Sequence, residues 1–271
     1  MTDLRRLHCI VPGASVDLSA VGTSDTSAAP GDKAATKAGT AALVERLAEA
    51  QEVLWARRHE KVLIVLQGID TSGKGGTVEH VFGGVNPAGL KVTSFKAPSE
   101  SELERDYLWR VHANVPRAGE IGVFDRSHYE DVLAVRVLGL LPEARWRRRF
   151  DHINAFEQLL HDEGTTIVKV LLHISKDEQL RRLEARLADP HKRWKFQVGD
   201  LDARGRWDAY QAAFAEAVER TATDHAPWHI VPADKKWYRN WAVASIVVAT
   251  LEGMDLTWPE PEEDLSSIVM E

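Results

Sequence analysis

The sequence predicts an α/β fold in which one parallel sheet is covered by helices on both faces. Five short apolar runs alternate with segments of helical periodicity, and this alternation is typical of parallel sheets. The first run ends in a glycine-rich loop, and a helical pattern follows that loop directly. A strand, a glycine-rich loop and a helix in this order form a phosphate-binding loop. We therefore expect a P-loop three-layer sandwich.

Residues 1–40 are expected to form a flexible N-terminal arm, because most of this segment is rich in Ser, Ala, Gly and Thr and poor in large apolar side chains. From Thr40 the pattern changes to an amphipathic helix that continues to about Arg58. The main domain is predicted to span residues 41–258. Residues 259–271 are predicted to form a loose acidic tail.

The strands are predicted from apolar runs, since a strand buried on both faces is apolar along its whole length. They are expected at 61–68, 90–95, 120–125, 166–175 and 228–233. The intervening helices are predicted from apolar residues spaced three or four apart. The clearest of these patterns cover 102–111, 129–138, 147–160 and 207–221.

The composition limits the function classes. The chain has 271 residues and a net charge of −7, which disfavours a dedicated nucleic-acid-binding protein. Cys9 is the only cysteine, so neither a disulfide framework nor a zinc cluster is available. The sequence shows no leader and no apolar stretch long enough to span a bilayer. We expect a cytoplasmic protein that binds neither membranes nor nucleic acids.

The loop "GIDTSGKGGT" (residues 68–77) departs from the usual pattern G-x-x-x-x-G-K-[ST], in which the last hydroxyl binds magnesium. Gly75 follows Lys74, and no hydroxyl occurs before Thr77. Backbone N–H groups and the following helix N-terminus would still attract phosphate. The predicted phosphate-binding residues of the loop are Ser72, Gly73, Lys74, Gly75, Gly76 and Thr77. The alternative is a plain strand–turn–helix connection.

The missing hydroxyl implies that carboxylates hold the metal. Asp70 lies inside the loop, and Asp125 ends the third apolar run. The carboxyl ends of parallel strands meet at one edge, so these side chains should face each other and bind Mg²⁺, with Mn²⁺ as the alternative ion. Asp125 could instead cap the next helix. Glu130 is either a further residue of the metal site or an exposed helix residue.

Cations near this edge are candidates for neutralising the transferred group. Arg126 follows Asp125, where its guanidinium could stabilise charge on a phosphoryl group or, alternatively, pair with Glu130 or Asp131. Lys96 ends the second predicted strand and is a further phosphate-binding candidate.

The segment 181–206 is predicted to form a helical lid. "LRRLEARLADPHKRWKF" concentrates arginines and lysines, and Pro190 interrupts its helical pattern. A lid of this kind brings cations over a polyanion and excludes water. The alternative is an ordinary solvated helix face.

Several motifs in register resemble the family-2 polyphosphate kinases. They are "LQGIDTSGKGGTVEHVFGGVNPAGLKVTSFKAPSESE", "GVFDRSHYEDVL", "DPHKRWKFQVGDLDARGRWDAY" and "APWHIVPADKKWYRN". The resemblance runs from about Val53 to about Leu251 and implies a thymidylate-kinase-like fold. Some family members that accept nucleoside monophosphates carry asparagine at the position of Asp125, which leaves the acceptor preference open.

The resemblance implies Mg²⁺-dependent, direct in-line transfer of a terminal phosphoryl group between inorganic polyphosphate and a nucleoside mono- or diphosphate. The acceptor would be ADP or AMP, with GDP or GMP as alternatives. Matching positions make Asp70, Lys74, Asp125, Arg126 and Arg186 the catalytic candidates. Lys195 falls in a lid motif and is a phosphate-binding candidate. The resemblance also implies a homodimer or homotetramer.

Three other functions are considered. The first is an ATP-dependent nucleoside-monophosphate kinase, which the aspartate-bearing loop disfavours. The second is a nucleotide-sensing switch, but no N-K-x-D motif for guanine is present. The third is nucleic-acid binding through "RWRRRF", which the net negative charge disfavours.

Overall fold

The computed structural model describes residues 3–261, so most of the predicted tail lies outside the described residues. A single parallel sheet has the strand order β2-β3-β1-β4-β5. Its strands are β1 (Lys61–Gln67), β2 (Leu90–Ser94), β3 (Ile121–Asp125), β4 (Thr165–His173) and β5 (Trp228–Pro232). The α/β prediction is confirmed, and each strand lies within about two residues of its predicted range.

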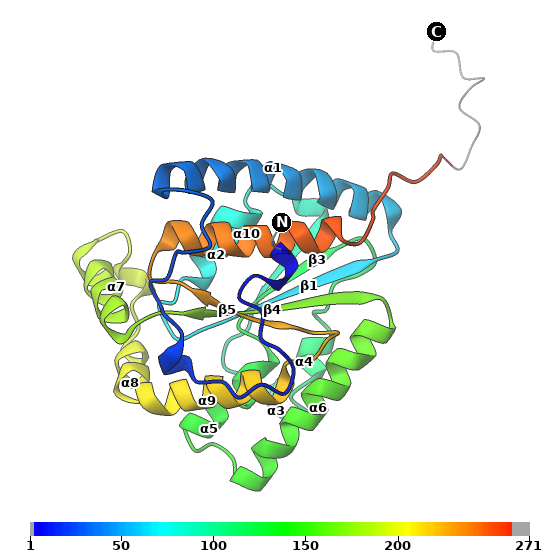
Figure 1. Ribbon diagram of the computed structural model, residues 1–271. Coiled ribbons are helices and arrows are strands. Elements are labelled where there is room, and N and C mark those ends of the chain that lie inside the picture. Colours follow the sequence, from blue (N-terminus) through cyan, green and yellow to red (C-terminus); the bar gives the residue numbers. More distant parts are fainter. Residues whose placement is uncertain (1–2, 262–271) are drawn as a thin grey trace.

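Helices cover both faces of this sheet (Figure 1). One face carries α1 (Lys33–Arg57), α2 (Lys74–Phe82) and α10 (Lys236–Glu252), which pack against one another. The other carries α5 (Ala134–Val137), α6 (Glu143–Asp162) and α9 (Trp207–Thr221). The helix α10 was not among the predicted elements. Its residues are buried on nearly every side, so it lacks the amphipathic pattern by which surface helices are recognised.

The remaining elements connect the strands and the helices named above. The helices are α3 (Glu100–Leu103), α4 (Trp109–His112), α7 (Lys176–Ala188) and α8 (Gly199–Gly205). The 3-10 turns are η1 (Leu4–Arg6), η2 (Leu18–Ala20), η3 (Pro87–Gly89), η4 (His128–Asp131) and η5 (Arg193–Lys195).

The single helix predicted over 102–111 is wrong, because α3 and α4 are separate. The Asp106 carboxylate accepts hydrogen bonds from the backbone N–H groups of Leu108 and Trp109, at 2.9 and 3.1 Å. An aspartate that binds the backbone two and three residues later starts a new turn. The helical pattern at 129–138 is divided in a similar way between η4 and α5.

The helix expected from Thr40 begins earlier, at Lys33. Asp32 caps it by accepting a hydrogen bond from the Ala35 N–H at 2.8 Å. The small residues that suggested an arm therefore form the first turns of α1, because alanine favours a helix once a cap is present.

Residues 3–32, which we call the N-terminal strap, lie against the domain surface beside β5 (Figure 1). Cys9 forms an antiparallel bridge with His229, and the Ile10 N–H donates to the Trp228 carbonyl at 2.8 Å. Leu7 and Leu18 are buried. The strap thus extends one edge of the sheet instead of standing apart from it.

His229, which contacts this strap, makes the stability of the folded chain depend on pH. Its side chain is buried, and its Nδ1–H donates a hydrogen bond to the carbonyl oxygen of Leu7 at 2.8 Å. Burial lowers the pKa of His229 to about 4. In the unfolded chain His229 becomes protonated near pH 6.5, whereas in the folded chain it stays neutral down to about pH 4. The free energy of unfolding therefore decreases as pH falls from about 6.5 towards 4.

We expect acidification from pH 7 to pH 5 to cost about 2 kcal/mol of unfolding free energy through His229 alone. In His229→Asn the amide can replace the Nδ1–H donor without titrating, so this variant should lose correspondingly less stability over that range. Urea unfolding at both pH values measures the difference. Equal losses in both proteins would show that His229 does not titrate in this way.

Within residues 3–261, none of the helices combines the length and apolar character that crossing a bilayer requires.

Candidate active site

The glycine-rich loop joins β1 to α2 at the carboxyl edge of the sheet, as predicted. Gly73 caps α2 with a left-handed backbone, φ +106°, which glycine adopts without strain. A Cβ at Gly73 would also collide with the guanidinium of Arg239. Lys74 is buried, and its Nζ donates to the Gly68 carbonyl oxygen at 2.7 Å. Burial lowers the pKa of Lys74, although the carboxylates of Asp70 and Asp125 oppose this shift.

The hydroxyls of the loop are used differently. The Thr77 hydroxyl donates to the Gly73 carbonyl at 3.1 Å, within the first turn of α2. This bond gives Thr77 a structural role and does not point to metal binding. The Ser72 hydroxyl is buried without a hydrogen-bond partner among the described residues. A buried polar atom of this kind at a phosphate-binding loop is available to a ligand.

Asp70 and Arg126 form an ion pair across the carboxyl edge. Burial favours the neutral acid, but the charges of Lys74 and Arg126 outweigh burial and lower the pKa of Asp70. Arg126 has a left-handed backbone, φ +64°, which is rare and strained for a residue other than glycine. Arg126 forms its salt bridge with Asp70, and neither Glu130 nor Asp131 is its partner.

Asp125 ends β3 directly beside β1, paired in register with Leu66. Its Oδ2 lies 3.9 Å from the Cβ position of Gly75, so the carboxylate faces the start of α2. It does not cap η4, since the Ser127 hydroxyl takes that role by accepting from the Tyr129 N–H at 3.2 Å.

Glu130 lies on the same side as Asp125. The favoured orientation of the buried Gln67 amide places its nitrogen 3.0 Å from Glu130 Oε1 and its oxygen 3.0 Å from Ser127 Oγ. Burial raises the pKa of Glu130, although Arg126 and Lys74 oppose this shift. Glu130 is therefore a half-buried residue of the site, and the reading as an exposed helix residue is wrong.

These carboxylates suit a magnesium ion. Within residues 3–261, no three Asp, Glu, His or Cys side chains converge into a protein-only metal cage. Magnesium is usually held by one or two carboxylates together with phosphate oxygens and water. Asp70 and Asp125 match that donor set.

The lid segment consists of α7, η5 and α8, and α7 ends at Ala188, just before Pro190. Arg186 Nη1 lies 3.3 Å from Asp200 Oδ2, which joins α7 to α8. The charge of Arg186 is the last of several that lower the pKa of Asp70, after those of Lys74 and Arg126. Lys195 is exposed, with its Nζ 5.1 Å from the ring centroid of Trp194.

The other cations fall into two groups. Lys96 follows the carboxyl end of β2 and is exposed at the same edge as the loop. Lys91 and Arg117 lie near the amino ends of β2 and β3. They are therefore at the opposite edge of the sheet.

Arg182 was grouped with the exposed lid cations, but the structure places it beneath the loop. It is buried and donates to the carbonyl oxygens of Thr71 and Ser72 at 2.9 and 2.8 Å. It also donates to the Ala233 carbonyl at 2.6 Å and to Glu178 at 2.5 Å. Burial lowers the pKa of Arg182 to about 10. It therefore ties the loop to α7 and to the end of β5.

Arg239 and Tyr210 were not identified from the sequence. The buried Arg239 donates to Asn240 Oδ1 at 2.7 Å. Among the described residues, no carboxylate forms an ion pair with it. Burial lowers its pKa to about 10. Tyr210, on α9, has a raised pKa through burial and the nearby charges of Glu130 and Asp70. Arg239 lies in the quoted segment "APWHIVPADKKWYRN", but the sequence has no signal for its contact with Gly73.

Comparison with known proteins gives consistent matches. The family model "Polyphosphate kinase 2 (PPK2)" matches residues 31–259. The AMP/ADP-polyphosphate phosphotransferase of Meiothermus ruber is 52% identical over 97% of this chain and 98% of its own. The ADP-polyphosphate phosphotransferase of Rhodopseudomonas palustris is 41% identical over 80% of this chain and 79% of its own.

A solved structure has the same architecture. The crystal structure of polyphosphate kinase 2 from Arthrobacter aurescens TC1 has a TM-score of 0.91 and 45% sequence identity, covering 96% of this chain and 97% of the other. The loop with Gly75 in place of the usual hydroxyl and the ion pair between Asp70 and Arg126 thus occur in a chain that matches this family along nearly its whole length. The chain belongs to the polyphosphate kinase 2 family.

Proposed function

We propose that this protein transfers the terminal phosphoryl group between inorganic polyphosphate and a nucleoside mono- or diphosphate, with magnesium. The relative at 52% identity is named for both AMP and ADP, which supports acceptors of both classes. ADP and AMP are the proposed acceptors, with GDP and GMP as alternatives.

One observation about charge carries this proposal. The guanidinium groups of Arg182 and Arg239 both lie within 4 Å of the Cβ position at Gly73 of the loop. Burial and these two charges lower the pKa of Lys236, at the start of α10. Lys192 and Arg181 of the lid contribute to the same shift. Cations from α7, the lid and α10 are thus concentrated beside the loop. A long linear polyanion is the ligand that such a concentration of positive charge suits.

Each site residue has a role in an in-line transfer. The Lys74 ammonium and the loop N–H groups hold the phosphoryl oxygens. The Arg126 guanidinium, oriented by Asp70, stabilises charge on the group in transit, and Arg186 adds charge from the lid. Lys96 and Lys195 are proposed to bind phosphates further along the donor or acceptor. Positioning and electrostatics suffice for this chemistry, and no covalent intermediate on the protein is required.

Asp70 and Asp125 would hold the magnesium ion, or manganese as the alternative. The bound ion would neutralise charge on the phosphates and align them. The Asp70 carboxylate stays ionised for this purpose at neutral pH, because the charges of Lys74 and Arg126 lower its pKa despite its burial.

The function is tested with purified protein, magnesium, long-chain polyphosphate and one acceptor at a time (AMP, ADP, GMP or GDP). Anion-exchange chromatography separates the products. We expect a nucleotide longer by one phosphate, and a loss of at least about 100-fold in the variants Lys74→Ala and Asp125→Ala, because each removes charge stabilisation of the transition state. Asp70→Asn should also be impaired.

The control separates this function from an ordinary kinase. The same protein receives ATP and a nucleoside monophosphate without polyphosphate, and Glu252→Gln on the exposed end of α10 serves as an unimpaired variant. Transfer from ATP alone, with none from polyphosphate, would replace the proposal by an ATP-dependent nucleoside-monophosphate kinase. A homodimer or homotetramer and a cytoplasmic location stay predictions.

A further inference from the structure

A set of fully buried polar side chains lies directly behind the turn that carries Arg126 and Glu130. At its centre, Lys169 of β4 and Glu157 of α6 form an ion pair with 2.5 Å between Nζ and Oε2. Neither residue has any exposed surface. An ion pair in such a place is no more stabilising than well-packed apolar residues. Its presence in the core therefore calls for a reason other than stability.

Every donor of Lys169 is used. Besides Glu157, the ammonium donates to the Tyr129 hydroxyl at 3.0 Å and to the Thr221 carbonyl at 2.7 Å. The Thr221 hydroxyl in turn accepts from Trp228 Nε1 at 2.9 Å. The network thus has a fixed geometry set by β4, α9 and β5 together.

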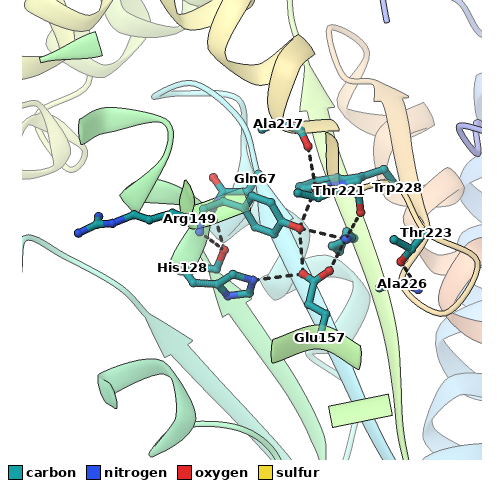
Figure 2. Close-up of polar contacts among 12 residues, drawn as sticks. Gln67, His128, Arg149, Glu157, Ala217, Thr221, Thr223, Ala226 and Trp228 are labelled. Carbon is teal, nitrogen blue, oxygen red and sulfur yellow. Dashed lines mark hydrogen bonds and ion pairs between the residues drawn. The ribbon is translucent and has the colours of Figure 1, made fainter. Parts of the chain in front are cut away.

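The second oxygen of Glu157 binds the turn that follows β3. Glu157 Oε1 accepts from the Tyr129 hydroxyl at 2.9 Å and from His128 Nε2 at 3.2 Å. Figure 2 shows the side chains of His128 and Glu157 pointing towards each other, with Thr221 and Trp228 on the other side of the network. Both rings are fully buried.

The order of residues in this turn is informative. Arg126, in its left-handed conformation, and Glu130 face the site, whereas His128 and Tyr129 between them point to the buried pair. The chain supplies two inward anchors within one turn and two outward site residues at its ends. Fixing the anchors therefore fixes where Arg126 and Glu130 stand.

We propose that the buried Lys169–Glu157 pair is a positioning device that holds the Arg126–Glu130 turn in its reactive geometry. The inference rests on the proposed phosphotransfer, which depends on the Arg126 guanidinium. Apolar packing is not directional, whereas hydrogen bonds fix the directions of the groups that they join. A displacement of about 1 Å in a reacting group can cost on the order of 100-fold in rate.

Two variants test this. Tyr129→Phe removes only the hydroxyl that joins the turn to the pair. The double variant Glu157→Leu/Lys169→Met removes both charges and approximately keeps the volume, so it leaves no charge unpaired. In each we expect kcat to fall at least about tenfold while both KM values stay within about twofold, because the turn is displaced but the binding loop is not.

Hydrogen exchange gives a readout that does not depend on activity. Backbone amides of residues 126–131 should exchange faster in both variants, whereas those of 72–77 should keep the wild-type rate. Glu252→Gln, which removes an exposed pair with Arg46, is the control and should change neither kcat nor exchange.

Wild-type kcat and wild-type exchange in the folded double variant would overturn the inference. If the double variant does not fold, Tyr129→Phe decides by the same two measurements. If the wild-type protein transfers no phosphoryl group, the proposed function fails on its own. In that case amide hydrogen exchange in the two variants tests this inference by itself. An unchanged rate at residues 126–131 would contradict it, and a faster rate would support it.

Discussion

Replacing Arg126 with lysine should reduce kcat for transfer from polyphosphate by about 1,000-fold, which is within the range known for arginines that stabilise phosphoryl transfer. Lysine keeps the positive charge but lacks the planar fork of donors, which pairs with Asp70 and is proposed to bind phosphoryl oxygens as well. The KM for polyphosphate should change little, because Lys74 and the loop N–H groups still bind the donor. Steady-state kinetics with ADP at saturating polyphosphate measure both values.

Arg126→Gly is the matched control for folding. Glycine accepts the left-handed backbone at this position, so the loss of the side chain should leave the unfolding free energy within about 1 kcal/mol of wild type. Low activity in this stable variant would assign the effect to the guanidinium. A loss of less than tenfold in either variant would remove Arg126 from the catalytic group.

Replacing Arg182 with methionine should destabilise the protein by about 3 kcal/mol. The change leaves the buried Glu178 without its inner partner and the carbonyls of Thr71 and Ser72 without their donor. The loop should lose its fixed shape as well, so kcat/KM for polyphosphate should fall at least about tenfold. Urea unfolding and steady-state kinetics measure the two effects.

Arg181→Met provides the comparison for Arg182. Arg181 is the neighbouring residue on α7 and contacts the same Glu178, but its side chain is 70% exposed. Exposed pairs contribute about 1 kcal/mol or less, so the unfolding free energy of this variant should stay near that of wild type. Equal effects at the two positions would mean that Arg182 acts only through its charge and does not support the loop.

Local patterns in the sequence predicted the sheet well. A strand buried on both faces is largely apolar along its length, which holds for β1, β3, β4 and β5, whereas the edge strand β2 has no buried residue. All five runs were located to within about two residues. The glycine loop was found because its residues are adjacent and their chemistry is local. Helices were predicted less well where a cap intervened, as at Asp106, or where the helix is buried all round, as in α10.

The facing of the loop and Asp125 was also predictable, since parallel strands bring their carboxyl ends to one edge. The sequence did not predict which charged groups pair at that edge. The sequence offered Glu130 or Asp131 as the partner of Arg126, whereas in the fold Arg126 pairs with Asp70. A choice of this kind depends on distances of a few ångströms between segments far apart in the chain.

The sequence by itself thus determined the α/β class, the phosphate-binding loop and the acidic residues that suit a metal. Only the tertiary structure decided that the N-terminal strap extends the sheet, that Arg182 and Arg239 lie against the loop, and that Lys169 and Glu157 pair beneath the Arg126 turn. Local patterns reflect the preferences of neighbouring residues, which the sequence records directly. A buried cation or carboxylate is placed by partners from distant elements, and those partners are defined only once the chain has folded.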